Sequence, residues 1–143
     1  MAAVNTRFSI AVHLMSGLGY GGKECGGNHT SGELSHSVNA CPSFVRRVVS
    51  RLAKAGLVHT TRGKSGTCAL ARPAKEITLL DIHRAVDAPK PFALHDYPPQ
   101  EDCIVSCNIR AVLEDIQETT RKAFEATLKA ITLADVLSGL GKR

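Results

Sequence analysis

The sequence predicts a mainly helical fold with one small β-hairpin, and three observations lead to that prediction. Apolar residues recur at helical spacing in several separate segments, and two short strand patterns flank a basic, glycine-rich turn. The last third of the chain carries one much longer helical pattern. The chain has 143 residues, of which 43% are hydrophobic and only 4% aromatic, so we expect a compact and mostly aliphatic core.

The first helix is predicted from the apolar residues between Phe8 and Met15. Six glycines then fall between Gly17 and Gly27. Because glycine is a poor helix former, we expect a flexible loop over residues 16–29. This loop has neither the spacing nor the preceding strand of a phosphate-binding loop, so we interpret it as an insertion between two helices.

Two short helices joined by a tight turn follow this loop. Thr30 begins a capping-box pattern that opens the first of them. Pro42 suits the first turn of the second, where its missing N–H leaves no hydrogen bond unsatisfied. Apolar residues at helical spacing from Val45 to Leu52 give the second helix one buried face, and Gly56 ends it.

A β-hairpin and a further helix complete the first part of the chain. The strands are predicted over residues 57–61 and 67–71, around the basic turn of residues 62–66. Thr78 can cap a helix that continues to Val86. The next segment contains four prolines, so we expect a loop there. We divide the chain into residues 1–87, a loop over residues 88–107, and a long helix with its tail over residues 108–143.

The long helix carries an apolar stripe, with charged residues on its other faces. Either the stripe packs back on its own domain, or it forms the interface of a dimer. We favour the dimer, because the other helices already form a small core among themselves. The predicted interface residues are Ile109, Val112, Leu113, Ile116, Ala123 and Thr127.

The second short helix and the hairpin turn carry the polar residues that predict a function. The combination indicates a winged helix-turn-helix that binds double-stranded DNA, with the second helix in the major groove. Arginine pairs with guanine edges, and cations on the wing can reach the flanking backbone or minor groove. A formal net charge of +5 permits such an anionic partner. The candidate DNA-binding residues are Ser43, Arg46, Arg47, Ser50, Arg51, Arg62 and Lys64.

Several segments of the chain form one combination of motifs, and these segments are residues 7–15, 45–58, 62–66, 70–73, 77–82 and 132–136. Together they closely resemble the Rrf-two family of bacterial winged helix-turn-helix transcriptional regulators. The resemblance implies a homodimer, joined through a long C-terminal helix, that binds a palindromic operator and usually represses transcription. It covers nearly the whole chain, and its motifs are specific in combination.

Iron–sulfur members of this family carry three cysteines in the loop before the dimer helix. This chain has only Cys103 and Cys107 there, whereas a cluster takes about four ligands. His95, Asp102 or a residue of the first helix are the alternatives for a missing ligand. We predict no cofactor and place the sequence closer to the cluster-free branch of the family.

The five cysteines are an odd number in a chain without a predicted secretion signal, so they do not indicate a disulfide framework. Cys103 and Cys107 can form a disulfide or pair with Cys25. Cys41 lies at a predicted helix N-terminus near two arginines, which favours a reactive thiolate. Cys25, Cys41, Cys103 and Cys107 are therefore candidate redox sensors. The alternative is that cysteines such as Cys41 and Cys68 are ordinary small side chains.

The sequence also allows functions other than transcriptional regulation. A thiol-redox enzyme is disfavoured, because the spacing of Cys103 and Cys107 is not Cys-x-x-Cys and no base accompanies the pair. A protein-interaction module of the same fold remains an alternative, as does a regulator that responds to a small molecule. No segment has the run of apolar residues needed for a membrane helix, so we expect a cytoplasmic protein that is not an enzyme.

Overall fold

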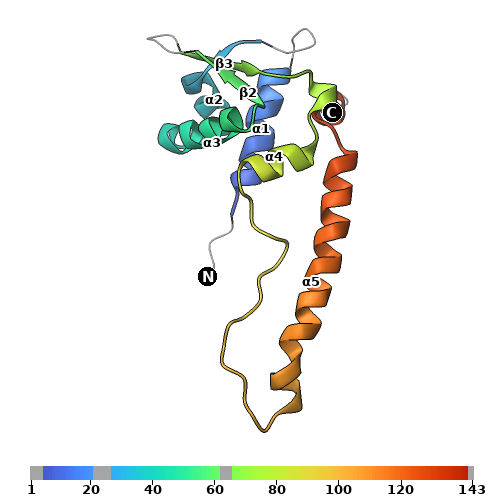
Figure 1. The fold of residues 1–143 in the computed structure, drawn as a ribbon. Coiled ribbons are helices and arrows are strands. Elements are labelled where there is room, and N and C mark those ends of the chain that lie inside the picture. The colour runs from blue at the N-terminus through green and yellow to red at the C-terminus, as the bar shows by residue number, and fades with distance from the viewer. Residues whose placement is uncertain (1–4, 21–26, 62–65, 142–143) are drawn as a thin grey trace. The chain divides into compact units, whose positions relative to one another are not determined.

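The computed structural model describes residues 5–20, 27–61 and 66–141 of the chain (Figure 1). These residues form a mainly helical fold with one small antiparallel sheet, which confirms the predicted fold class. The α-helices are α1 (Arg7–Gly19), α2 (Ser31–Val38), α3 (Pro42–Lys54), α4 (Leu79–Ala85), α5 (Ile104–Ala130) and α6 (Leu133–Leu140). The strands are β1 (His29–Thr30), β2 (Val58–Thr60) and β3 (Thr67–Leu70), and a short 3-10 helix, η1 (Ala74–Glu76), precedes α4.

Helices α2 and α3 form the predicted helix-turn-helix. The Thr30 hydroxyl accepts a hydrogen bond from the Glu33 amide at 3.1 Å, and the Glu33 carboxylate accepts one from the Thr30 amide at 2.8 Å. This capping box fixes the start of α2. Asn39 ends α2 in the left-handed conformation, with φ 58°, and Pro42 is the first residue of α3. The sequence therefore determines this turn through local hydrogen bonding and backbone preference.

The sheet contains the predicted hairpin and one additional strand. Its order is β1-β3-β2, and β2 pairs antiparallel with β3 so that Val58 faces Leu70. Gly56 precedes the hairpin with φ +76°, a conformation that favours glycine. Strand β1 was not predicted, because its two residues are too few to show an alternating pattern.

The prediction of a loop from residue 16 onward is wrong for its first four residues. Helix α1 continues to Gly19 and includes Gly17. A Cβ atom at Gly19 would lie 2.8 Å from the side chain of Leu137 on α6, so the glycine allows these two helices to approach closely. This tertiary packing outweighs the cost of glycine in a helix, which is about 1 kcal/mol per residue.

The chain divides into two compact units. One contains Met1–Ala88 together with Leu128–Arg143, and the other contains Pro89–Thr127. This division differs from the predicted one, because the C-terminal tail belongs with the first unit. Leu133 is fully buried there, and its amide donates a hydrogen bond to the Ile77 carbonyl at 2.8 Å. Such a pairing of distant segments leaves no local signal in the sequence.

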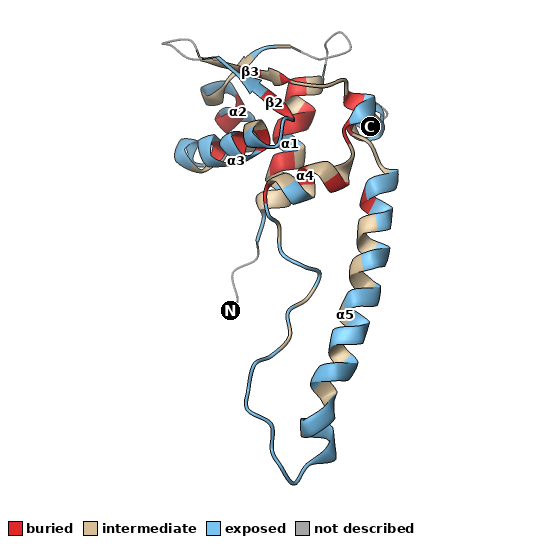
Figure 2. Cartoon of the chain, in the orientation of Figure 1, coloured by how far each residue is buried: buried red, intermediate tan, exposed pale blue. Residues whose placement is uncertain are grey.

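Apolar side chains are buried mainly in the first unit (Figure 2). Helix α1 lies at its centre and packs against α2, α3, α4, α6 and β3. The core is aliphatic, as predicted, and the largest fully buried side chains include Leu14, Met15, Leu52 and Ile82. No helix in the described part of the chain is both long and apolar enough to cross a membrane.

In the second unit, the predicted loop is shorter than expected. Helix α5 begins at Ile104, so residues 104–107 are helical rather than part of the loop. The sulfur of Cys103 accepts a hydrogen bond from the Ser106 amide at 3.4 Å, which satisfies one of the free amides of the first helical turn. Cysteine is not among the usual capping residues, so the sequence pattern did not indicate this start.

Candidate nucleic-acid interface

Helix α3 presents a polar face because its apolar face is fully used in the core. Val45, Val48, Val49 and Leu52 are all buried. Ser43, Arg46, Arg47, Ser50 and Arg51, the predicted DNA-binding residues on this helix, are all exposed. The helical repeat therefore brings five of the seven predicted residues to the accessible side of one helix. The other two, Arg62 and Lys64, lie outside the described residues.

The exposed arginines of α3 differ in the contacts they make. The Arg47 guanidinium lies 5.7 Å from the centroid of the Phe44 ring, one turn earlier on the same helix. This cation–π contact restrains the side chain near the helix surface. Arg51 instead donates a hydrogen bond to the Val86 carbonyl at 3.3 Å. The structure thus gives Arg51 an intramolecular partner at the end of α4.

A pocket of about 550 Å³ lies between α3 and the hairpin strands. Arg46, Ser50 and Lys54 line it from α3, and Thr60 and Thr61 line it from the hairpin. The two threonines and Ser31, which also lines the pocket, were not predicted as functional residues. The only sequence signal for Thr60 and Thr61 is their position directly before the basic turn. Hydroxyls and cations of this kind are the groups that bind nucleic-acid phosphates.

Cys41 lies directly before the first residue of α3 and is exposed. Its sulfur is 3.1 Å from the Ser43 hydroxyl. A hydrogen bond from this hydroxyl lowers the pKa of the Cys41 thiol, assisted by the Ser43 and Phe44 amides and by the charge of Arg46. Cys68 on β3 is the opposite case, because burial raises the pKa of its thiol. The two cysteines thus differ in both exposure and thiol pKa.

The remaining candidate cysteines lie in different parts of the chain. Cys103 and Cys107 are both exposed; Cys103 directly precedes α5, and Cys107 lies in its first turn. Cys25 lies outside the described residues. Cys103 and Cys107 lie close together, because the Cys107 amide donates a hydrogen bond to the Cys103 carbonyl.

The donor set around these two thiols does not fit an iron–sulfur cluster within one chain. A cluster takes about four protein ligands, and Cys103 and Cys107 supply two. Among the residues the structure describes, no three His, Cys, Asp or Glu side chains are grouped so that they could hold a metal ion. We therefore assign no chemical step to iron at this position, and the absence of a cofactor stays a prediction.

Helix α5 contains the predicted dimer interface. Val112, Ile116, Ala123 and Thr127 are exposed, whereas Ile109 and Leu113 are only partly accessible. Ile109 and Leu113 lie on the side of the helix that also carries Gln117, whose side chain donates to the Phe92 carbonyl at 2.9 Å. The six predicted residues therefore fall into two groups with different accessibility.

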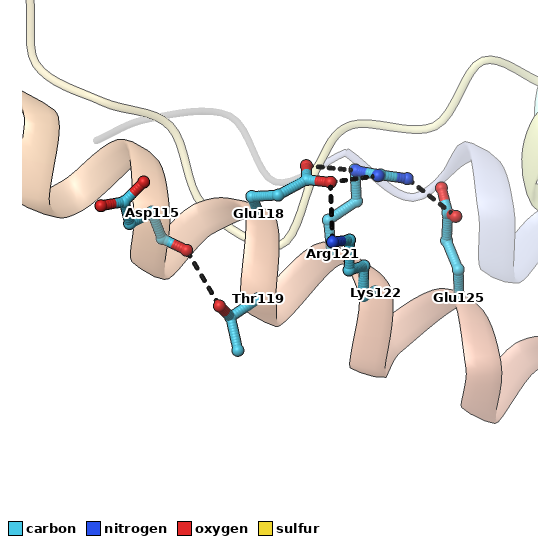
Figure 3. A network of polar contacts seen from close by, with 6 residues as sticks. All are labelled: Asp115, Glu118, Thr119, Arg121, Lys122 and Glu125. Atoms are coloured by element: carbon cyan, nitrogen blue, oxygen red, sulfur yellow. Dashed lines mark hydrogen bonds and ion pairs between the residues drawn. The ribbon is translucent and has the colours of Figure 1, made fainter.

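Four charged residues in the second half of α5 are paired within the helix (Figure 3). Arg121 donates to Glu118 at 2.8 and 2.6 Å and to Glu125 at 2.9 Å, and Lys122 lies 3.8 Å from Glu118. The hydrogen bond from Arg121 lowers the pKa of Glu118, and the two carboxylates raise the pKa of Arg121. These pairs stabilise the helix locally and do not require a partner.

Comparisons with known proteins agree with this geometry. The chain is 33% identical over 139 residues to YwnA of Bacillus subtilis, described as an HTH-type transcriptional regulator, and the match covers 96% of this chain and 98% of that protein. Among solved structures, T. potens IscR is 25% identical with a TM-score of 0.67, covering 97% of this chain and 88% of that one. CymR, the global cysteine regulator of B. subtilis, is 24% identical with a TM-score of 0.66 and shares the fold over 96% of this chain and 98% of its own.

The description of YwnA as an HTH-type transcriptional regulator agrees with the class of protein predicted from the sequence. The family model that matches is Rrf2, described as an iron-dependent transcriptional regulator, and it matches residues 4–139. This match covers nearly the whole chain and confirms the resemblance identified from the sequence. The chain therefore belongs to the Rrf2 family of transcriptional regulators.

Proposed function

We propose that this protein is a homodimeric repressor that reads a specific DNA sequence with α3. The observation that carries the proposal is the exposed polar face of α3 beside the pocket at the hairpin. Ser43, Arg46 and Arg47 lie in the first half of the helix, which is the part a recognition helix presents to base edges. Ser50 and Lys54 lie further along and suit contacts with phosphates.

The wing completes this interface in the proposal. Thr60 and Thr61 line the pocket from the hairpin, and the basic residues Arg62 and Lys64 follow directly in the sequence. In this proposal Arg62 and Lys64 contact the flanking DNA backbone or the DNA minor groove. A regulator of this kind acts where the chromosome is, so we place it in the cytoplasm.

The second copy of the chain is proposed to cover the exposed face of α5. Val112 and Ile116 are 52% and 48% exposed, and Ile104 and Val105 are 80% and 62% exposed. Val105, Val112, Ile116 and Ala123 are seven, four and seven residues apart, which is compatible with the seven-residue repeat of a helix–helix seam. The charged side chains of Glu118, Arg121, Lys122 and Glu125 are already paired within α5 (Figure 3). The apolar seam is therefore the part of the α5 surface whose burial against a partner is most favourable.

We also propose that DNA affinity responds to thiol oxidation, with Cys103 and Cys107 as the sensor. Both thiols are accessible, as a reaction with a soluble oxidant requires. They lie at the start of the helix that we propose as the dimer interface. An oxidant can therefore act on dimer geometry without touching the DNA-binding surface.

One observation favours a small-molecule response as the second candidate. A pocket of about 580 Å³ lies between α1, α2 and α6, and it falls within the size range of ligand sites. Val12, Val136 and Leu140 provide apolar walls. His13 and Ser37 provide polar atoms 3.1 Å apart. A ligand here would contact α2, the helix that positions α3.

Mutation of α3 tests the proposed function directly. We would select preferred sites from random-sequence duplexes and measure affinity and its salt dependence for Arg46→Ala and Arg47→Ala. Loss of a base contact costs about 1–3 kcal/mol, or roughly 5- to 150-fold in affinity, and relaxes the preference at one position. Lys75→Ala removes an exposed charge from η1 and is the matched control, with an expected change below about twofold. Unchanged binding of both arginine variants would contradict the proposal.

A further inference from the structure

The two thiols at the start of α5 are part of the hydrogen bonding that begins the helix. The Cys103 sulfur accepts from the Ser106 amide at 3.4 Å, and the Cys107 thiol donates to the Gln100 carbonyl at 3.3 Å. The Cys107 sulfur is also 3.8 Å from the Glu101 carbonyl oxygen. The Gln100 amide in turn donates to the Ser106 hydroxyl at 2.7 Å. Both cysteines therefore hold the turn before α5 against its first helical residues.

The two cysteines are free thiols, and they lie four residues apart at the start of α5. The Cys107 amide donates to the Cys103 carbonyl at 3.0 Å, which places the residues one helical turn apart. Side chains at this spacing have Cβ atoms about 5–6 Å apart. A disulfide requires about 3.5–4.5 Å between the same atoms, so the turn must deform by roughly 1–2 Å to close it.

Closure also removes contacts that now hold the turn. A disulfide sulfur carries no proton, so Cys107 can no longer donate to the Gln100 carbonyl. The Cys103 sulfur moves away from the Ser106 amide, which then lacks its present acceptor. Formation of the Cys103–Cys107 disulfide is therefore expected to disrupt the first turn of α5.

We propose that Cys103 and Cys107 form a reversible intrachain disulfide with peroxide as the oxidant, and that closing it unwinds the first turn of α5. Ile104 and Val105 lie in this turn and are 80% and 62% exposed. Their displacement removes apolar surface from the face of α5 assigned to the second copy. The resulting fall in operator affinity rests on the proposed function, whereas the disulfide and the unwinding do not.

The reaction proceeds in two balanced steps. The Cys103 sulfur attacks one peroxide oxygen, the O–O bond breaks, and Cys103 becomes a sulfenic acid with release of one water. The Cys107 sulfur then attacks the Cys103 sulfur, the S–O bond breaks, and the departing hydroxide takes the Cys107 proton as a second water. Two thiols are oxidised and one hydrogen peroxide is reduced. Cys103 attacks first because the Cys107 proton is held by the Gln100 carbonyl.

The experiment uses the full-length reduced protein, treated anaerobically with stoichiometric hydrogen peroxide. Peptide mapping should show a Cys103–Cys107 disulfide with the loss of two hydrogens. Hydrogen exchange in residues 104–108 should become at least about tenfold faster on closure and recover after dithiothreitol. In Cys107→Ser the sulfenic acid should persist on Cys103 and be trapped by dimedone. Cys41→Ser is the control and should keep both the disulfide and the exchange response.

Three outcomes would overturn the inference. These are a disulfide between two copies, a disulfide from either cysteine to Cys25 or Cys41, and an intrachain disulfide that leaves exchange in residues 104–108 unchanged. Binding of the reduced protein to a selected duplex, measured in parallel, separates the two proposals. If the reduced protein shows no sequence preference, the proposed function fails while the disulfide result stands.

Discussion

On α3, the four apolar residues from Val45 to Leu52 are at most 5% exposed, whereas Val112 and Ile116 on α5 are about half exposed. Both helices carry an apolar stripe and a charged face in the sequence. The contrast shows that such a pattern predicts a helix without predicting what covers it. On α3 the chain itself covers the apolar face, so the polar face is left for a partner. On α5 the apolar face is the one left accessible.

The largest expected effect comes from breaking the seam on α5. The double variant Val112→Lys/Ile116→Lys should be monomeric by sedimentation. Each copy would bring two lysines to the interface, and four positive charges close together cannot be buried there. Loss of simultaneous binding to both half-sites should lower operator affinity about hundredfold. Ala111→Lys adds a charge to the neighbouring polar face and should remain dimeric. A double variant that stays dimeric with full affinity would place the interface elsewhere.

The next effect compares an exposed and a buried cysteine of the first unit. At near-neutral pH, Cys41 should react with iodoacetamide at least about tenfold faster than Cys68, because it is exposed and the pKa of its thiol is lowered. Burial protects Cys68 and raises the pKa of its thiol. Mass spectrometry of timed samples gives both rates in one experiment. Ser43→Ala should slow Cys41 alone, and equal rates for both cysteines would contradict this prediction.

A smaller effect tests which arginines of α3 face outward. Arg51 donates to the Val86 carbonyl, so we expect it to position α3 against α4 rather than to bind phosphate. Arg51→Ala should reduce operator affinity roughly fivefold, equivalent to about 1 kcal/mol, with an unchanged salt dependence. Lys54→Ala, which removes a cation lining the pocket, should instead reduce the salt slope by about one. If Arg51→Ala also reduces the slope of the salt dependence, Arg51 contacts DNA phosphate and this prediction is wrong.

These contrasts also show where prediction from sequence succeeds. Thr30, Pro42 and Gly56 act through local hydrogen bonding or backbone preference, and all three mark the expected boundaries. The exposed face of α3 follows from helical periodicity for the same reason. Such features depend on residues within a few positions of each other, so a single sequence contains their signal.

The features that escaped prediction depend on distant partners. Helix α1 continues through Gly19 because Leu137 packs against it, and the C-terminal tail joins the first unit through Leu133. The helix start at Cys103 relies on a sulfur acceptor that is an unusual cap. In the sequence Arg51 resembles the other exposed cations of α3, and only the fold brings it to the Val86 carbonyl. In each case the missing information was three-dimensional proximity or an uncommon hydrogen bond.

The smallest expected effect concerns the pairs that stabilise α5 from within. The Arg121 hydrogen bond lowers the folded-state pKa of Glu118, so its contribution is present above the unfolded pKa of about 4.3 and is lost as the pH falls through the folded value. Glu118→Gln should lower the thermal midpoint by at most about 1 °C at neutral pH, because the pair is exposed, and should have a smaller effect near pH 3. Circular dichroism melts at both pH values measure this difference. Asp115→Asn is the control, since its side chain points away from Arg121 in Figure 3. A Glu118→Gln effect that is equal at both pH values would show that the carboxylate charge does not stabilise α5.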